Sequence, residues 1–148
     1  GKDIINVDKL NLSNIDVIHD FEIFPYPFAD GSGLHINATH VIEHLADVPK
    51  FMDECWRILQ PGGTLYMETP HAKDIALSFS DPTHKQHLTE HSFINYFTLE
   101  GIENFGYSKF AWSILHIETV NGVIFVHLMP IPVEYYQDEI LKRLNNLP

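Results

Sequence analysis

The sequence has little cysteine, few basic residues and no long apolar run, and each shortage argues against a class of protein. Its one cysteine, Cys55, cannot form an internal disulfide, so we expect a reducing, cytoplasmic setting. Nine Lys and Arg residues stand against 20 Asp and Glu, and the formal charge of −11 argues against a nucleic-acid partner. No apolar stretch approaches the ~20 residues of a membrane-spanning helix, and no signal-peptide pattern is present, so we expect no membrane partner.

The order of apolar and polar residues predicts a single α/β domain over residues 1–148. Hydrophobic residues make up 45% of the chain, which is enough for a real core. A helix is expected after Asp47, a capping residue, and "QPGG" at 60–63 should end it. Asn121-Gly122 is a strong hairpin signal between two apolar runs. The same patterns predict strands over 3–8, 15–20, 34–39 and 64–70, a loop over 24–33, and helices over 90–104 and 133–146.

Two of the predicted strands end on a carboxylate, Asp8 in the first and Asp20 in the second. Open α/β sheets bind their ligands at the carboxyl ends of the strands. Either residue taken alone would be read as a turn former, because aspartate often accepts a hydrogen bond from the backbone two residues on. At this spacing we instead expect both carboxylates to face one ligand.

Five stretches follow one another in a set order over about residues 5–95. No single stretch is diagnostic, but the ordered series resembles the class I S-adenosylmethionine-dependent methyltransferases of the "methyltransferase type 11" kind. The resemblance implies a Rossmann-like sheet that is mostly parallel and closes with a C-terminal antiparallel hairpin. The stretches are "INVDKL", "VIHDFEIFPYPFADGSG", "INATHVIEHL", "ECWRILQPGGTLYMETP" and "DPTHKQHLT".

The resemblance also implies a role for particular residues toward S-adenosylmethionine. Asp8 would accept hydrogen bonds from the ribose hydroxyls, which suits a carboxylate because both hydroxyls can donate to one group. Asp20 would take the adenine amino group, with the backbone of Phe21 beside the ring. Ala38, Thr39 and His40, at the end of the next strand, would border the methionine part of the cofactor.

One family feature, the glycine-rich turn that cradles the methionine end, is not found before Asp8. We therefore expect an N-terminally truncated domain with weak or absent cofactor binding. In the family, the strand that carries this turn lies between the strands ending here at Asp8 and Thr39. Without it those two strands must pair directly, or another chain must fill the gap, or the domain is incomplete. Exposed strand edges lead us to expect a homo-oligomer.

The stretch "HVIEH" at 40–44 fits the H-x-x-E-H pattern of zinc proteases, which is the first of two metal interpretations. His40 and His44 would bind zinc, Glu43 would act as the base and Glu118 is a candidate third ligand. Such proteases place the pattern inside a long helix, however, and here an apolar strand ends directly before His40. The protease therefore remains the less favoured alternative.

The second metal interpretation keeps the methyltransferase fold. Some metal-dependent relatives carry E-x-x-E-H at this place, and this chain offers His40, Glu43 and His44, with His84 from "THKQHLT". Positions i, i+3 and i+4 share one face of a helix, so these side chains can converge on a divalent ion. Without a metal, His40, His71 or His84 could serve as the general base.

The favoured function is methyl transfer from S-adenosylmethionine to an oxygen or nitrogen of a small molecule. Relatives with "DPTHK" suggest a sugar or a surface-polysaccharide precursor as the acceptor. The alternative is a catalytically silent methyltransferase-like domain whose strand edges favour self-association.

Overall fold

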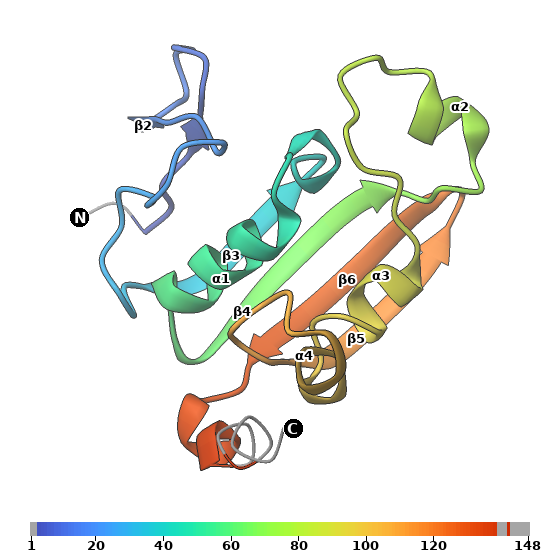
Figure 1. The fold of residues 1–148 in the computed structure, drawn as a ribbon. Coiled ribbons are helices and arrows are strands. Elements are labelled where there is room, and N and C mark those ends of the chain that lie inside the picture. The colour runs from blue at the N-terminus through green and yellow to red at the C-terminus, as the bar shows by residue number, and fades with distance from the viewer. Residues whose placement is uncertain (1–2, 139–141, 143–148) are drawn as a thin grey trace.

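The computed structural model describes residues 3–138 and residue 142, which form two sheets and several short helices (Figure 1). The strands are β1 (Val7–Asp8), β2 (Val17–Ile18), β3 (Gly33–Thr39), β4 (Leu59–Pro70), β5 (Trp112–Val120) and β6 (Val123–Pro130). The helices are α1 (Val48–Ile58), α2 (Ile75–Phe79), α3 (Glu90–Ile94) and α4 (Leu99–Phe105), with 3-10 turns at η1 (Ile42–His44) and η2 (Val133–Tyr135).

The larger sheet has the strand order β3-β4-β6-β5. β3 runs parallel to β4, whereas β6 is antiparallel to both of its neighbours. The predicted hairpin at Asn121-Gly122 is confirmed, and both residues have positive φ, 49° and 78°, as a tight two-residue turn requires. The sheet is therefore mixed, with a parallel part near β3 and an antiparallel hairpin at its other end.

β1 and β2 form a separate two-stranded parallel sheet, with Val7 opposite Val17 and Asp8 opposite Ile18. The prediction gave each of these strands six residues, but only two in each are paired. Within residues 3–138 and 142, β1 pairs with β2 and β3 pairs with β4, so direct pairing of β1 with β3 is not what occurs. One edge of β1 and one edge of β3 are thus left without a partner strand in the described part of the chain.

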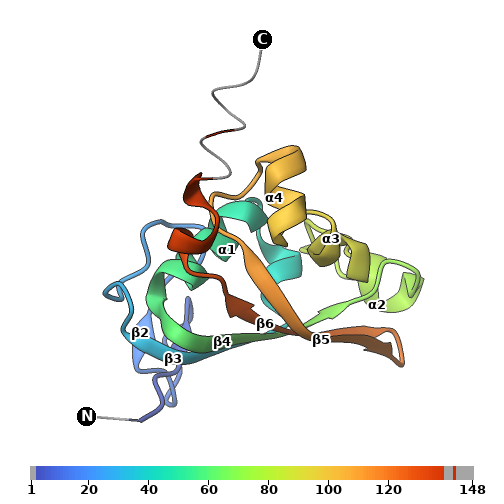
Figure 2. The same ribbon diagram turned by 90° about the horizontal axis from the view of Figure 1, so that it is seen from below.

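The core lies between the larger sheet and helices α1, α3 and α4, which cover one of its faces (Figure 2). Helix α1 begins where predicted, because the side chain of Asp47 accepts a hydrogen bond from Lys50 N at 3.0 Å. Its apolar face packs on alternate side chains of β4 and β6, since successive residues of a strand point to opposite faces. The buried residues at this contact are Phe51, Met52, Cys55, Leu65, Met67, Ile124, Val126 and Leu128. Across residues 3–138 and 142, no helix has the length and apolar character needed to cross a membrane.

Two of the predicted helices take a different form. The helix expected over 90–104 is two helices, α3 and α4, because Thr98 caps a new helix by accepting from Gly101 N. The helix expected over 133–146 starts as a 3-10 turn at Val133–Tyr135. Residues 139–141 and 143–146 of this predicted helix lie outside the described residues. α2 was not predicted.

Arg57, at the end of α1, holds the loop 24–33 against the helix. Its guanidinium donates to Phe28 O at 2.7 Å and to Tyr26 O at 3.2 Å. It also donates twice to the Glu54 carboxylate, at 2.8 and 2.9 Å, and once to Asp30. This loop leads back to Phe21, so the same anchor fixes one wall of the site.

Candidate functional site

Two neighbouring cavities lie where β1, β2 and β3 end. The first, about 470 Å³, is lined by Asp8 and Asp20 and is called here the carboxylate cleft. The second, about 580 Å³, is called the histidine pocket, and its lining residues are His40, Glu43, His44, Pro70, Ala76, Leu77, Ser80, Asp81 and His84. His40 and His44 line both cavities, so the two adjoin.

The carboxylate cleft brings together the two aspartates that the sequence singled out. β1 and β2 run parallel, and both Asp8 and Asp20 line the cleft. That the two carboxylates bind one ligand remains a prediction. The turn-forming interpretation holds as well: one oxygen of Asp8 accepts from Leu10 N at 2.9 Å, and one of Asp20 accepts from Glu22 N at 3.0 Å. Each carboxylate is therefore fixed by one oxygen, and its other oxygen accepts no hydrogen bond from residues 3–138 or 142.

Hydrogen bonds and an ion pair hold in place the wall of the carboxylate cleft that carries Phe21. The carboxylate of Glu22 accepts from Ala46 N at 3.0 Å and from Lys85 Nζ at 2.8 Å, and so joins this wall to two distant segments. The buried hydroxyl of Tyr26 donates to Phe21 O at 2.8 Å, and burial raises the pKa of this phenol far above its ordinary value. Phe21 itself lines the cleft, and its predicted place beside the adenine ring remains a prediction.

Ala38, Thr39 and His40 were expected to border the cofactor, and of these three only His40 lines a cavity. Ala38 is buried in the core. The Thr39 hydroxyl donates to Asn37 Oδ1 at 2.9 Å. Neither lines the carboxylate cleft or the histidine pocket; the next residue along the chain, His40, is the one that reaches both cavities.

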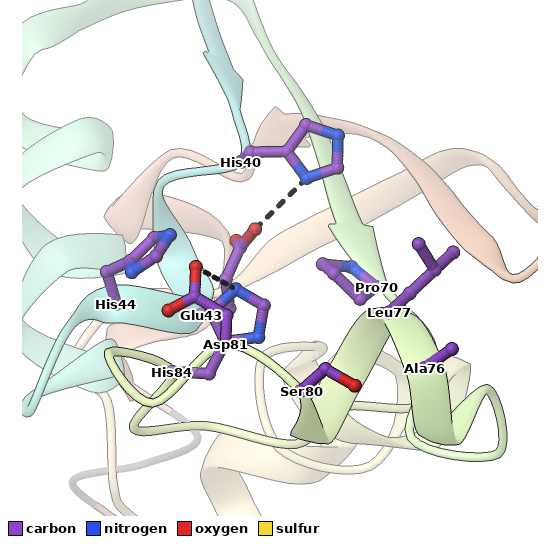
Figure 3. A pocket seen from close by; sticks show the side chains of 9 residues that line it. All are labelled: His40, Glu43, His44, Pro70, Ala76, Leu77, Ser80, Asp81 and His84. Atoms are coloured by element: carbon purple, nitrogen blue, oxygen red, sulfur yellow. Dashed lines mark hydrogen bonds and ion pairs between the residues drawn. The ribbon is translucent and has the colours of Figure 1, made fainter.

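His40 has an unusual backbone and a defined side-chain partner. Its φ is +54°, a left-handed conformation that is costly for a residue other than glycine and that often marks a functional site. Its Nδ1 lies 3.1 Å from Oε1 of Glu43 (Figure 3). When Nδ1 donates to this carboxylate, Nε2 of His40 is left as a hydrogen-bond acceptor.

Glu43 is a buried carboxylate, with only 2% of its side chain exposed. Its Oε2 accepts from the Thr69 hydroxyl at 3.1 Å. Its backbone carbonyl accepts from Lys85 N at 2.7 Å and Gln86 N at 3.0 Å, which ties the segment "THKQHLT" to the HVIEH turn. A carboxylate kept this far from water needs a positively charged or hydrogen-donating partner.

The tautomers of His84 and His44 follow from their partners. His84 Nδ1 lies 2.9 Å from the carbonyl oxygen of Ser78, which can only accept, so Nδ1 carries the proton. The Thr83 hydroxyl donates to Asp81 at 2.6 Å and must therefore accept from His44 Nδ1, 3.1 Å away. In both rings the neutral form then has its lone pair on Nε2.

Glu43, His44 and His84 each offer a ligand atom, and these atoms lie within 4.8 Å of one another. Asp81 adds a carboxylate oxygen 3.6 Å from His84 Nε2, and its hydrogen bonds from Thr83 lower the pKa of the Asp81 carboxyl. Such a group of carboxylate oxygens and imidazole lone pairs attracts a cation, either a proton or a divalent metal ion. A metal-binding histidine commonly donates its second N–H to a carbonyl or another oxygen, which is the arrangement of both rings here.

His71, one of the three predicted bases, is not in either cavity. Its Nδ1 accepts from Lys73 N at 2.9 Å, so Nε2 carries the proton and donates to Glu90 at 3.0 Å. Hydrogen bonds from Thr119 and His71 lower the pKa of the Glu90 carboxyl. With both ring nitrogens engaged, His71 links β4 to α3, and the prediction of a catalytic role for it is not supported.

The HVIEH turn also departs from the protease pattern. Ile42–His44 is a single 3-10 turn and not part of a long helix. His40 pairs with Glu43 and does not belong to the ligand group of His44, while Glu118 lies on β5, 3.3 Å from His116. The structure therefore gathers Glu43, His44 and His84, three of the four predicted metal ligands, and leaves out His40.

Sequence reasoning missed the residues that orient these ligands. Thr83 and Asp81 fix His44, and Ser78 fixes His84. Thr83 N also donates to Asp81 Oδ1 at 2.8 Å, an aspartate turn that the letters "DPT" indicate. The Ser78 contact uses a backbone carbonyl, so no side-chain pattern could have revealed it.

The fold is that of a class I methyltransferase-like α/β domain, and part of the sequence is similar to methyltransferases as well. Residues 4–67 match the family model described as a methyltransferase domain. A curated Mycolicibacterium smegmatis protein, whose description names an S-adenosylmethionine-dependent methyltransferase, is 32% identical over 76 residues; these make up 51% of this chain and 29% of that protein. Part of this chain is thus similar in sequence to a methyltransferase domain and to a protein described as an S-adenosylmethionine-dependent methyltransferase.

Solved structures show the same fold at low sequence identity. A chain in the complex of the Haloferax volcanii Trm112 methyltransferase activator with a methyltransferase superposes with a TM-score of 0.57 at 14% identity, over 81% of this chain and 63% of that one. An S-adenosylmethionine-dependent methyltransferase from Aquifex aeolicus gives a TM-score of 0.52 at 15% identity, over 81% of this chain and 57% of that one. A Bacillus halodurans structure described as a methyltransferase gives a TM-score of 0.52 at 15% identity, over 80% of this chain and 72% of that one. The chain spans less than two thirds of the curated relative and of the first two structures.

Proposed function

We propose that this chain acts in S-adenosylmethionine-dependent methyl transfer to an oxygen or nitrogen of a small molecule. One observation carries the proposal: Asp8 and Asp20 face a cleft that adjoins a histidine-lined pocket, with His40 and His44 at the junction. A nucleoside held by the two carboxylates would extend toward the pocket in which an acceptor is activated. Proximity and alignment would then supply most of the catalysis.

The carboxylate cleft suits the nucleoside part of the cofactor. The free oxygens of Asp8 and Asp20 can accept from the ribose hydroxyls and from the adenine amino group. Phe21 and Leu45 add apolar surface for a flat ring. When bound, S-adenosylmethionine supplies an electrophilic methyl group on a sulfonium, whose S–C bond breaks as the bond to the acceptor forms.

His40 is the residue best placed to take a proton from the acceptor. Glu43 orients the ring through Nδ1, and Nε2 can accept the proton of a hydroxyl or amine in the histidine pocket. Imidazole is the side chain whose charge changes nearest neutral pH. His84, also predicted as a base, is better placed as a metal ligand because its Nε2 belongs to the ligand group.

Glu43, His44 and His84 would hold a divalent metal ion, which would polarise an acceptor oxygen and lower its pKa. The preset tautomers of the two histidines support this site. A sugar acceptor, which the resemblance in sequence suggests, could place vicinal hydroxyls there. The chain's location in the cytoplasm remains a prediction.

Binding of S-adenosylhomocysteine tests the cofactor role. Weak binding is expected, because the glycine-rich turn is not in this sequence, so the titration is followed by NMR up to millimolar ligand. Shifts should appear at the carboxylate cleft, and Asp8→Asn or Asp20→Asn should weaken binding roughly 10–100-fold, the range for a hydrogen bond to a charged group. Asp138→Asn, an exposed position outside the cleft, is the control. Shifts that ignore Asp8 and Asp20 would contradict the proposal.

Binding of Co²⁺, followed by its visible absorption, tests the metal site without requiring activity. Thr83→Val removes the oxygen that fixes His44 and should weaken Co²⁺ binding about 10–100-fold, as loss of an outer-shell partner does. Thr64→Val is a matched control, because Thr64 bonds the ring of His35 in the same way at 2.8 Å, outside the pocket. If the wild-type chain binds no Co²⁺, the proposed metal site is excluded. His40 then remains as the one group proposed to activate the acceptor.

Within residues 3–138 and 142, one edge of β1 and one edge of β3 have no partner strand, and these edges favour a second candidate, a domain that self-associates. Leu34, on β3, is 51% exposed, and Ile4, beside β1, is 73% exposed. Leu34→Lys should then lower the mass measured by light scattering, whereas Ile75→Lys on α2 should not. A wild-type chain that is monomeric at high concentration would exclude this candidate.

A further inference from the structure

Two histidines lie opposite each other on the β5–β6 hairpin, on the face of the larger sheet that α1, α3 and α4 do not cover (Figure 2). His116 of β5 is the register partner of His127 of β6. The residues on either side of His127, Val126 and Leu128, are buried in the core, and successive side chains of a strand point to opposite faces. His127 and its partner His116 therefore point away from the helices.

The register brings the two imidazoles within reach of one ion. Directly opposite residues of an antiparallel pair have Cβ atoms about 4.5–5.5 Å apart. Two nitrogens that bind one metal ion at about 2 Å lie about 3–4 Å from each other, a separation that side chains on such neighbouring Cβ atoms can reach. The register also shifts directly before the pair, between Ile114 and His116, and bulges of this kind often re-aim a side chain beside a functional site.

Glu118 adds a carboxylate to the two imidazoles. It lies two residues after His116, on the same face of β5, and its Oε1 is 3.3 Å from Nε2 of His116. The side chains of His116 and Glu118 are 59% and 54% exposed, so both can turn toward an ion without disturbing the core. The sequence pattern offered Glu118 as a ligand of the HVIEH turn, whereas the structure places it beside a different histidine.

The ring of His127 has an aromatic neighbour and no hydrogen bond. It meets Tyr66 of β4 edge-on, with ring centroids 6.2 Å apart and ring planes at 79°. The Tyr66 hydroxyl donates to Glu68 Oε1 at 2.8 Å and not to this ring. Among residues 3–138 and 142, no group forms a hydrogen bond with a ring nitrogen of His127. A rotation of this side chain toward His116 therefore breaks no hydrogen bond, and it completes a set of two imidazoles and one carboxylate.

We propose that His116, His127 and Glu118 bind a divalent transition-metal ion on this face of the sheet. Imidazole nitrogens suit Zn²⁺ and Cu²⁺, whereas Mg²⁺ and Ca²⁺ prefer ligand sets made of oxygen. The bound ion links β5 to β6 and stabilises their hairpin, because it binds the folded chain and not the separated strands. This site is separate from the ligand group of the histidine pocket, and the inference does not depend on methyl transfer.

Titration of the chain with Zn²⁺, followed by NMR, tests the site because each histidine ring gives its own signals. The signals of His116 and His127 should shift together, whereas Mg²⁺ at the same concentration should leave them unchanged. His116→Ala and His127→Ala should each weaken Zn²⁺ binding at this site roughly 10²-fold, the lower end of the gain from linking two binding groups. His35→Ala is the matched control, because His35 is an exposed histidine of the same sheet whose ring bonds Thr64 on β4.

His84→Ala separates the two metal sites, since it removes a ligand of the histidine pocket and should leave the Zn²⁺ response of His116 and His127 as in wild type. The proposal is overturned if the response of this pair disappears in His84→Ala, or if neither ring responds at millimolar Zn²⁺. It is also overturned if His127→Ala, folded by its NMR spectrum, binds Zn²⁺ at His116 as tightly as wild type. His116 and Glu118 would then bind the ion without a ligand from β6.

Discussion

Replacing Arg57 with methionine removes the guanidinium that holds the loop 24–33 on α1 while keeping most of the apolar stem. Two of its bonds reach the carbonyls of Phe28 and Tyr26, worth about 1 kcal/mol each. The bidentate pair with Glu54, whose side chain is 13% exposed, adds about 1–2 kcal/mol. Asp30, 83% exposed, adds little. We therefore expect the free energy of unfolding to fall by about 3 kcal/mol.

Urea denaturation at pH 7 measures this change, with Lys73→Met as the control for loss of an exposed cation. Arg57 lowers the pKa of the Glu54 carboxyl below its ordinary value of 4.5, so the stability from this pair is present above that pH. It is lost as the pH falls through the lower pKa of the folded state. The difference between wild type and Arg57→Met should shrink at pH 3. A loss below about 1 kcal/mol at pH 7, or a difference that grows in acid, would refute the reasoning.

Three further predictions concern the hairpin, the C-terminal contact and the base. Gly122→Ala should destabilise the chain by more than about 1 kcal/mol in urea, because φ is +78° and a Cβ would meet the Asp74 carboxylate; an unchanged midpoint would contradict this. Tyr136→Phe should cost about 1–2 kcal/mol, because the buried Tyr136 hydroxyl accepts from Ala111 N at 3.1 Å; thermal unfolding would show it, and no shift would count against it. His40→Asn should lower the methyl-transfer rate about 10²–10⁴-fold, the usual contribution of a positioned general base, whereas an unchanged rate would mean that another group is the base.

Where a local signal was strong, the sequence predicted the fold correctly. Asp47 caps α1 as expected, and Asn121-Gly122 forms the turn, because both depend on neighbours within a few residues. The lengths of β1 and β2 were predicted wrongly, since strand length is decided by the partner strand and not by apolar pattern alone. The region 90–104 was read as one helix, although Thr98 offered a second capping signal.

The site was predicted in part, for a similar reason. Asp8 and Asp20 meet because parallel strands end at one edge, a rule that needs only the order of elements. His84 and His44 meet because the backbone of Glu43 anchors the later segment, which no pattern in the sequence reports. His71 looked equivalent to His84 by type and position, but it lies outside both cavities and its ring contacts Glu90.

The two histidines at the junction of the cavities have a thermodynamic consequence. A ligand in the carboxylate cleft and a ligand or ion in the histidine pocket would each contact His40 and His44. Whichever binds first would therefore change the affinity for the other, and the change in affinity is the same in either direction. Titrating one ligand at several fixed concentrations of the other would measure this linkage as a single coupling constant.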